Sequence, residues 1–528
     1  MQAKYITYQE TNAFSSVVLD YIGGKAQLKE FYRYSPNFNG FSEAIENRSF
    51  MGDRSVLVQT LKKQYVSARP SALVQANIEL LADEKTFTIT TGHQLNIFTG
   101  PLYFIYKIVT AINLAKDLKK QFPDYNFIPV YWMATEDHDF EEINHVRVED
   151  KMLTWNKDAS GATGRLDTKD IIETLTAYKG YLGIGKNGLM LSRLVEDAYT
   201  NNAKLSDATR ELVDALFGEY GLVCIDADEI ALKKQFAEII YKDITEENSF
   251  NHINNSNGQL EELGYKVQVN PREINFFYMT DGLRERIVFE DDVYKVMHTD
   301  IGFNASELKK EVEEHPERFS PNVVMRPVYQ EVILPNLAYI GGGAEVTYWL
   351  QLKASFDHYK VDFPVLMLRN SALIIDKRSE QKMEVLGLSY KQLFSDLETL
   401  KTNWIKSHVN LQLTLNDEER AIRAVFDQIK LNAYKIDKTL SQSADAAKTK
   451  ALKLITALEQ KMIRAEKRKH VTSFSQLESL KGKLFPNGVL QERVLNIAPM
   501  FVLYGDEFIG SLIDTFKPLD HQFTIIFA

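Results

Sequence analysis

A strand, an amphipathic helix and a second strand follow one another between residues 85 and 134, and this unit constrains the fold more than any other feature. The strands are predicted from KTFTIT and from FIPVYWMA, whose unbroken apolar run is typical of a buried strand. Between them Pro101 suits a first helical turn, and Ile105, Ile108 and Ile112 mark one helix face. Such units are right-handed and build parallel sheets that bind ligands beyond the carboxyl ends of their strands. The sequence therefore predicts an α/β fold with a site at that edge.

The composition limits the classes of function. The chain has 528 residues, of which 45% are hydrophobic, so it can bury a large core in more than one domain or with sizeable insertions. A formal net charge of −10 argues against a protein built to grip nucleic acid. There is no signal-peptide core or membrane-spanning run, and the single cysteine, Cys224, excludes an internal disulfide. We expect a cytoplasmic protein that acts on small molecules, with no nucleic acid or membrane as partner.

Other segments extend or interrupt the α/β pattern. Residues 1 to about 84 are predicted as a helical lead-in, and GLVCIDAD continues the parallel sheet, with Cys224 as a small hydrophobe rather than a nucleophile. Insertions are predicted at about residues 151–188 and 251–296, the second as an antiparallel sheet built from KVQVN, INFFYM and RIVFED. The chain is then predicted to return to helix and loop from Met325, before a strand within FPVLMLRNSALIID.

A coiled coil is predicted between residues 379 and 470. Apolar residues recur at alternating steps of four and three in two stretches, separated by a break near residues 437–443. The first seam comprises Ile422, Phe426, Ile429, Ala433, Ile436 and Leu440, and the second comprises Ala451, Ile455, Leu458, Met462 and Ala465. We therefore expect two antiparallel helices, and then a helix and a terminal strand that dock back on the main body.

The turn between the first strand and its helix, TGHQLNIFTGP, is a candidate anion cradle. Glycines let a ligand approach the backbone at a helix start, and polar side chains surround them. The candidate ligands are Gly92, His93, Gln94, Asn96, Thr99, Gly100 and, further into the helix, Lys107. The alternative is a tight structural turn with Lys107 facing water, and neither a Walker motif nor a dinucleotide fingerprint is present.

The second strand ends in TEDHDFEEINH, the densest cluster of ionisable groups in the chain. Crowding separates the pKa values of neighbouring groups, so Glu136, Asp137, His138 and Asp139 are candidates for general acid/base work or for binding an amine. A metal site at His138 and His145 lacks a recognised ligand pattern, and we predict none. The structural alternative is a helix start stabilised by acidic residues.

A third group of polar residues lies in MRPVYQE, in the glycine turn GGGAE and in LRNS. Arginine forks suit carboxylates and phosphates, although each arginine could equally form a structural ion pair. The candidate substrate ligands are Arg326, Gln330, Glu331, Gly342, Gly343, Glu345, Tyr348, Arg369 and Ser371.

Four long motifs in this order resemble the bacillithiol biosynthesis cysteine-adding enzymes over nearly the full chain. The motifs are TTGHQLNIFTGPLYFIYKIVTAINLAK, PVYWMATEDHDFEEINHV, FSPNVVMRPVYQEVILPNLAYIGGGAEVTYWLQLK and KMIRAEKRK. The resemblance implies a Rossmann-like catalytic core with insertions at residues 1–378, an antiparallel helical coiled coil at 379–470 that makes a homodimer, and a docking segment at 471–528. Two positions depart from the expected family pattern: His93 stands where a glutamine is common, and the glycine turn lacks a proline.

The implied reaction joins L-cysteine to the glucosamine amine of glucosaminyl malate. A malate moiety calls for arginines, an amine nucleophile for carboxylates, and an activated carboxylate for a nucleotide. We therefore expect ATP as a substrate, Mg²⁺ as its candidate companion, and no structural metal. The resemblance also implies a core related in outline to class I aminoacyl-tRNA synthetases, although neither of their two signature motifs is present. This outline, the glycine turn at a helix start and the missing P-loop favour an adenylate over an acyl phosphate. The alternatives are a nucleotide-binding scaffold that acts through its coiled coil and a transferase that uses a pre-activated acyl donor.

Overall fold

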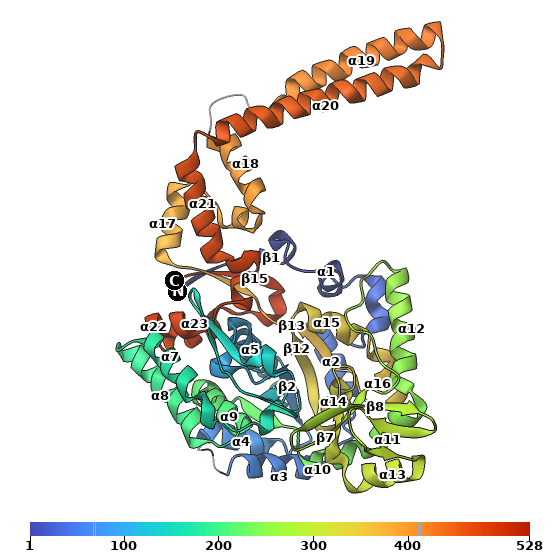
Figure 1. Ribbon diagram of the computed structural model, residues 1–528, viewed down its shortest axis with the longest axis vertical. Helices are drawn as coiled ribbons and strands as arrows, with labels where there is room; N and C mark the ends of the chain where they lie inside the picture. Colours follow the sequence, from blue (N-terminus) through green and yellow to red (C-terminus); the bar gives the residue numbers. More distant parts are fainter. Residues whose placement is uncertain (67, 69, 409–413) are drawn as a thin grey trace. The chain divides into compact units, whose positions relative to one another are not determined.

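The chain folds into two compact units (Figure 1). The computed structural model describes residues 1–66, 68, 70–408 and 414–528. Unit 1 comprises residues 1–9, 13–373 and 490–526, and unit 2 comprises residues 10–12, 374–489 and 527–528. Within the described ranges, the helices are all too short or too polar to cross a membrane.

A parallel sheet of five strands forms the centre of unit 1, in the order β13-β12-β2-β3-β6. The strands are β2 (Thr86–His93), β3 (Asn126–Met133), β6 (Val223–Asp226), β12 (Asn336–Gly341) and β13 (Val365–Leu368). The predicted strand–helix–strand unit is confirmed as β2, α5 (Leu102–Gln121) and β3. The predicted α/β class, with a Rossmann-like parallel sheet, is likewise confirmed.

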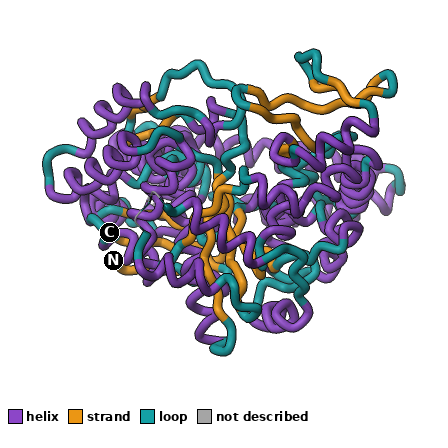
Figure 2. Tube along the Cα trace, turned by 90° about the horizontal axis from the view of Figure 1, so that it is seen from below, coloured by secondary structure: helices purple, strands orange, loops and turns teal. Residues whose placement is uncertain are grey.

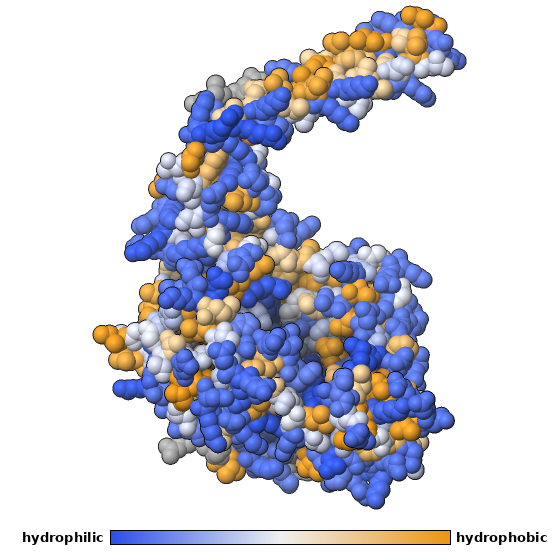
Figure 3. All heavy atoms as spheres, viewed as in Figure 1, coloured by the Kyte–Doolittle hydropathy of each residue, from blue (hydrophilic) through white to orange (hydrophobic). Residues whose placement is uncertain are grey.

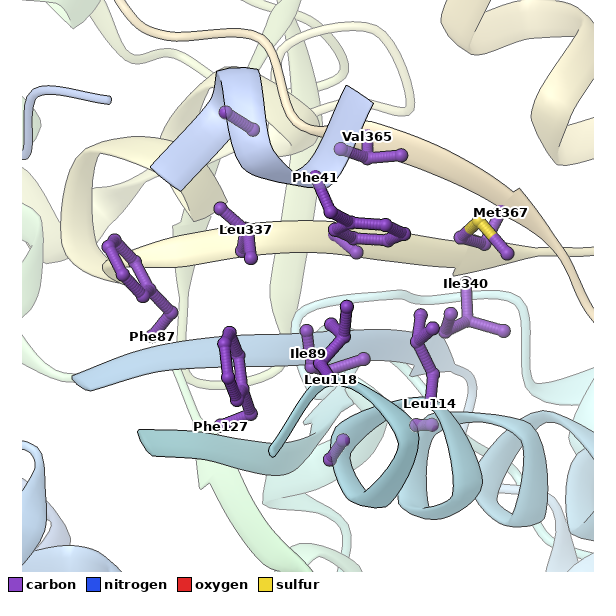
Figure 4. Close-up of a cluster of buried hydrophobic side chains, with 14 of the residues drawn as sticks. Phe41, Phe87, Ile89, Leu114, Leu118, Phe127, Leu337, Ile340, Val365 and Met367 are labelled. Carbon is purple, nitrogen blue, oxygen red and sulfur yellow. The ribbon is translucent and has the colours of Figure 1, made fainter. Parts of the chain in front are cut away.

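Helices cover the sheet on both sides, as Figure 2 shows. One face packs against α2 (Phe38–Asn47) and α5, where Phe41, Leu114 and Leu118 meet the alternate strand residues Ile89 and Ile340 (Figure 4). All five of these side chains are fully buried. Burial of this apolar face holds the strands in register, and so fixes the edge at which they end.

The other helices of unit 1 precede, connect and follow these strands. They are α1 (Ser16–Ile22), α3 (Arg54–Gln64), α4 (Ala72–Leu80), α6 (Phe140–Ile143), α7 (Ile172–Leu182), α8 (Lys186–Asn201), α9 (Leu205–Phe217), α10 (Ile230–Lys233), α11 (Ala237–Glu246), α12 (Asn248–Glu262), α13 (Ala305–Glu314), α14 (Arg326–Ile333), α15 (Gly343–Leu350), α16 (Lys353–Tyr359), α22 (Ala498–Tyr504) and α23 (Glu507–Thr515). A hairpin of β4 (His145–Val148) and β5 (Lys151–Thr154) overlaps the start of the first predicted insertion.

The second predicted insertion is an antiparallel sheet in the order β10-β9-β8-β7-β11. Its strands are β7 (Phe276–Thr280), β8 (Leu283–Glu290), β9 (Val293–Val296), β10 (Gly302–Phe303) and β11 (Phe319–Pro321). The prediction of strands in its first part is wrong. Ile253 and Leu260 face the core from α12, and the side chain of Gln351 takes the backbone N–H groups of Gln268 and Val269 in place of a strand partner.

Three further predictions need correction. The segment NLAYIG was assigned to helix and loop, but it forms β12 in the middle of the main sheet. The strand predicted in FPVLMLRNSALIID is two strands, β13 and β14 (Ala372–Ile375), because the chain leaves the main sheet at Arg369; β14 joins β15 (Gln522–Phe527) and β1 (Gln2–Thr7). The helix predicted in FVLYGDEFIGSLID breaks at Gly505, whose φ of +60° ends α22.

Unit 2 is helical, and its antiparallel hairpin is as predicted (Figure 1). It contains α17 (Lys377–Val385), α18 (Leu397–His408), α19 (Asn416–Ile436), α20 (Leu440–Lys467) and α21 (Val471–Leu484). Ion pairs of 2.6 Å join α19 to α20 from Lys430 to Asp445 and from Lys448 to Asp427, which sets the antiparallel register. The predicted seam is only partly covered within one chain, because α19 contains no fully buried residue.

Candidate active site

A cavity of about 830 Å³ opens at the carboxyl edge of the main sheet. All five strands deliver lining residues directly after their ends: β2 at Gln94, β3 at Ala134, β6 at Ala227, β12 at Gly342 and β13 at Arg369. Parallel sheets place ligands at this edge because loops with free polar groups converge there. This cavity therefore lies at the position predicted from the strand–helix–strand unit.

Most of the predicted site residues line this cavity together. They are Gly92, His93, Gln94, Lys107, Glu136, Asp137, Arg326, Gly342, Gly343, Glu345, Tyr348 and Arg369. The predicted site residues that do not line this cavity are Asn96, Thr99, Gly100, His138, Asp139, Gln330, Glu331 and Ser371.

Two buried arginines mark a cationic end of the cavity. Arg326 donates one Nη1 hydrogen bond to Gln330 Oε1 at 2.9 Å, while its buried Nη2 has no hydrogen-bond partner among the described residues. Arg369 pairs with Glu492 and Ser371 through its two terminal nitrogens, and its buried Nε is similarly left unpaired by the described residues. Both guanidinium groups thus retain a donor for an anion.

The start of α15 adds backbone dipoles to the same end. Gly342 and Gly343 line the cavity, and a Cβ at position 342 would lie 3.7 Å from Nε of Arg369. Glycine keeps the backbone open at the point where the helix start and this arginine meet. The helix N-terminus adds positive potential beside the two arginines, and the carboxylate of Glu345 already accepts the N–H of Gly342 there at 2.8 Å.

Lys107 forms a buried ion pair with Glu345. The two charged atoms are 2.5 Å apart, and Nζ also donates to the carbonyl of Gly92 at 2.7 Å. Burial lowers the pKa of Lys107. For Glu345, burial acts to raise the pKa, but Lys107 together with hydrogen bonds from Tyr339 and the N–H of Gly342 lowers it. Lys107 therefore braces the strand β2 against α15 from within the cavity wall and does not face water.

Two carboxylates, those of Glu136 and Asp137, also line the cavity. Glu136 pairs at 2.7 Å with Lys233, a fully buried lysine that also donates to the carbonyl of Phe319. Asp137 accepts a hydrogen bond from Gln94 Nε2 at 2.7 Å. Burial opposes its ionisation, but hydrogen bonds from His138 and Gln94 and the charge of Arg284 hold the pKa of Asp137 well below its usual range. Asp137 is therefore an anion at neutral pH.

The neighbours of these carboxylates turn away from the cavity. His138 Nδ1 lies 2.7 Å from Arg284 Nη1, and the ring packs near Phe277 with about half of the side chain exposed. Asp139 caps α6 by accepting the backbone N–H of Glu142. Asp139 therefore fits the structural alternative, in which an acidic residue stabilises a helix start. His138 contacts the guanidinium group of Arg284. No cluster of three or more metal-binding side chains occurs in the described parts of the chain.

The predicted anion cradle at the start of α5 is occupied by the chain itself. The N–H of Leu102 donates to the carbonyl of Leu495 at 2.7 Å, and Asn496 binds the carbonyls of Phe98 and Gly100. Asn96 is turned toward the carbonyl of Glu142. The structure therefore places Asn96, Thr99 and Gly100 outside the cavity, and the helix start that lines the cavity is that of α15.

Three other predicted ligands act behind the cavity wall. Gln330 accepts from Arg326 and donates to Glu331, which pairs with Arg48 at 2.6 Å deep in the core. Burial raises the pKa of Glu331 to about 6 against the charge of Arg48. Ser371 accepts from Arg369. These residues orient arginines and do not line the space for a ligand.

Several lining residues carry no local sequence signal. Arg272 and Arg284 come from the segment around the antiparallel sheet, and Arg493 comes from the chain that returns from unit 2. Tyr103 and Trp132 supply aromatic walls; Arg369 lies over the ring of Tyr103 and Arg326 over that of Trp132, each at 5.5 Å. Only Trp132, which falls at a strand end, could have been found from the strand prediction.

His93 is held neutral in the cavity wall. Its Nδ1 accepts the backbone N–H of Gln94 at 2.9 Å, so the proton of the neutral ring lies on the buried Nε2, which has no partner among the described residues. Burial, followed by the charge of Lys107, lowers the pKa of His93 to about 3. His93 thus lines the cavity with a ring N–H that the described residues leave unpaired.

This neutral histidine predicts a pH effect on stability. Between pH 3 and the ordinary pKa of about 6.5, the unfolded state binds a proton that the folded state does not, so stability rises with pH in this window and falls on acidification. We expect wild type to lose about 1 kcal/mol per pH unit more than His93→Gln below pH 6. Denaturant unfolding at pH 7 and pH 5 measures both; equal losses in the two proteins would mean that His93 is protonated in the fold.

Comparison with known proteins agrees with this architecture. Residues 1–370 match the bacillithiol biosynthesis BshC N-terminal Rossmann-like domain, and residues 372–528 match the BshC C-terminal coiled-coil domain. A relative from Flavobacterium psychrophilum is 45% identical over 100% of this chain and 99% of its own, and one from Flavobacterium johnsoniae is 44% identical over 100% of both. Both relatives are named as a cysteine ligase, BshC. This chain therefore belongs to the bacillithiol biosynthesis BshC family.

Proposed function

We propose that this protein is a ligase that joins L-cysteine to the glucosamine amine of glucosaminyl malate, forming bacillithiol. The observation that carries the proposal is the division of one cavity into a cationic end, at Arg326 and Arg369, and a carboxylate pair, Glu136 and Asp137. A substrate with two carboxylates at one end and an amine at the other matches this division. The names of the relatives support cysteine as the second substrate.

The malate moiety is proposed to bind at the cationic end. Two arginines with unpaired buried donors and the start of α15 offer charge-assisted hydrogen bonds to two carboxylates. Trp132 and Tyr103 provide walls that keep water away from these contacts. Burial strengthens each of these interactions because the local dielectric is low.

The amine is proposed to lie at the carboxylate pair. Asp137 is ionised and attracts the ammonium form, while Glu136 faces the same space and accepts the proton that the amine must lose before it attacks. Arg284 lines the cavity beside these carboxylates, Arg272 lines the same cavity, and both suit the phosphate of an activated acyl donor. In this proposal the amine nucleophile binds at the carboxylates, and the phosphate leaving group binds next to it at the arginines.

Cysteine is proposed to react as an adenylate. Its carboxylate oxygen attacks the α-phosphorus of ATP and pyrophosphate leaves; the amine then attacks the acyl carbon, and AMP leaves with the electron pair of the broken C–O bond. Arginines would stabilise the phosphate charge in both steps, and Mg²⁺ would accompany the ATP phosphates. An acyl phosphate, formed by attack on the γ-phosphorus, would release ADP instead.

A deletion strain tests the proposed place of the reaction. Mass spectrometry of cell extracts should show glucosaminyl malate accumulating and bacillithiol absent, because the enzyme that joins cysteine to this amine would be missing. Restoring the gene provides the control. Unchanged bacillithiol in a strain without a second copy would contradict the proposal.

A homodimer through the α19–α20 hairpin is the proposed assembly. Apolar side chains of the predicted seam are exposed along this hairpin (Figure 3): Ile429 is 45% exposed, Ile436 81% and Leu458 50%. A single hairpin leaves these residues in water, whereas a second copy could cover them by coiled-coil packing.

Replacing Ile429 and Ile436 by lysine should convert a dimer to monomers. Charges in an apolar seam lose burial and repel across it, and the exposure of both residues in one chain means that the fold of the protomer should persist. Sedimentation velocity measures the change. The matched control, Gln428→Lys with Asn432→Lys, adds the same charge at polar exposed positions of α19 and should leave the assembly intact. An unaltered oligomer in the first variant would exclude this interface.

A further inference from the structure

The chain returns from unit 2 at Leu490 and runs beside two parts of the cavity wall. We call residues 490–496 the return segment. All of it belongs to unit 1, and Arg493 lines the cavity. Its neighbours Glu492 and Asn496 are buried, with 0% and 1% exposure, although neither lines the cavity. Because buried polar side chains are normally hydrogen-bonded, the contacts of Glu492 and Asn496 indicate what these residues do.

Glu492 fixes the orientation of Arg369. Its Oε1 lies 2.6 Å from Nη2 of Arg369, and its Oε2 accepts the backbone N–H of Ala372 at 3.0 Å. Arg369 Nη1 is held by the carbonyl of Asn370 and by Ser371 Oγ. Because both terminal nitrogens are engaged, Nε beside Gly342 is the donor left for a ligand.

Asn496 holds a strained turn at the entrance to α5. Phe98, Thr99 and Gly100 are consecutive residues with φ of +50°, +72° and +59°, a left-handed conformation that is strained at the two non-glycine residues. Asn496 Nδ2 donates to the carbonyls of Phe98 and Gly100 at 2.8 and 2.7 Å. Its Oδ1 accepts from the hydroxyl of Tyr178 at 2.9 Å. One amide therefore brackets the strained residues.

The strained turn sets where the cavity residues of α5 lie. The helix begins two residues after Gly100, and the carbonyl of Leu495 takes the first helical N–H, that of Leu102, at 2.7 Å. Tyr103 and Lys107, which line the cavity, follow in the next two turns. Strain in a backbone persists only where surrounding contacts impose it, and here the return segment supplies those contacts.

We propose that Glu492 and Asn496 are positioning residues of the active site, Glu492 for the ligand donor of Arg369 and Asn496 for the start of α5. The site is thus completed by chain that follows the helical unit in sequence. This inference rests on the proposed function for its kinetic test, and on local backbone dynamics for a second, independent one.

The kinetic test compares Glu492→Gln with wild type in the full-length protein. Glutamine keeps the shape and the Ala372 contact but removes the charge that holds Arg369. We expect KM for glucosaminyl malate to rise about tenfold or more, with a smaller change in kcat, since the arginine binds ground state and transition state alike. The control is Asp243→Asn, which also neutralises a buried carboxylate of unit 1, one that binds Ser249 and Tyr359, and should leave KM unchanged.

The dynamic test compares Asn496→Ala with Asn113→Ala by amide hydrogen exchange. Asn113 is a matched control, because its Nδ2 also donates to two backbone carbonyls, those of Ile513 and Phe516, and ties the same helix to the C-terminal chain. We expect exchange in residues 96–107 to be about tenfold faster in Asn496→Ala and near wild type in Asn113→Ala.

The outcomes separate the two proposals. Failure of wild type to ligate the substrates would overturn the proposed function, and the exchange measurement would then decide the inference alone. Unchanged exchange in Asn496→Ala would overturn it. A wild-type enzyme that ligates, together with a Glu492→Gln variant whose KM equals that of its control, would also overturn it.

Discussion

Replacing Glu136 by glutamine is expected to lower kcat by about 10²–10⁴, the usual effect of removing a general base. Glu136 lines the cavity at the end of β3 and is the carboxylate available to take a proton from the amine, since Asp137 is stabilised as an anion by its hydrogen bonds and Arg284. Glutamine keeps the shape of the side chain and a carbonyl oxygen beside Lys233, which also donates to the carbonyl of Phe319, so the fold should persist. Steady-state turnover, with a melting curve of each protein, measures both effects.

The turnover of His138→Ala, compared with that of Glu136→Gln, shows which of the two side chains takes the proton. The sequence places His138 in the acid/base cluster, but in the structure it lies outside the cavity lining and contacts Arg284. We expect a loss of no more than about tenfold, through Arg284. A larger loss for His138→Ala than for Glu136→Gln would assign the proton transfer to the histidine and contradict our interpretation.

Lys107→Met is expected to reduce the free energy of unfolding of unit 1 by about 3 kcal/mol. The lysine is buried, and its removal leaves the carboxylate of Glu345 without its cation in the cavity wall. Urea denaturation followed by tryptophan fluorescence suits the measurement, because three of the four tryptophans, Trp132, Trp155 and Trp349, lie in unit 1.

A double variant isolates the pair. Lys107→Met with Glu345→Gln removes both charges, so it should be less destabilised than the sum of the two single variants by about 1–3 kcal/mol. Strict additivity would mean that the two charges do not interact in the folded protein. The same series measured for turnover shows whether the brace between β2 and α15 also matters for the reaction.

The fold was predictable where a segment is long and periodic. The helix α5 and the strands on either side of it carry strong patterns, and the α19–α20 hairpin shows its seam over many turns. Strand β12 was missed because only five residues separate Pro335 from the glycines that begin at Gly341, and so short an apolar run fits a helix end equally well. Its place in the sheet is set by pairing with β2 and β13, which no local pattern encodes.

The site was predictable where a side chain follows a buried strand. Glu136 and Arg369 satisfy this rule, and both line the cavity. The rule does not separate adjacent residues. Asp137 lines the cavity, whereas the next residue, His138, contacts Arg284 and Asp139 caps α6. Residues such as Arg284 and Arg493 reach the cavity through tertiary packing of distant segments, and only the three-dimensional structure reveals them.

The most direct test is product analysis of a reaction that contains the purified protein, L-cysteine, glucosaminyl malate, ATP and Mg²⁺. We predict bacillithiol with AMP and pyrophosphate in equal amounts, and cysteine-dependent exchange of labelled pyrophosphate into ATP. Release of ADP and phosphate would replace the adenylate by an acyl phosphate. Failure to form bacillithiol from these substrates, or formation of it without any nucleotide, would contradict ligation through nucleotide-activated cysteine.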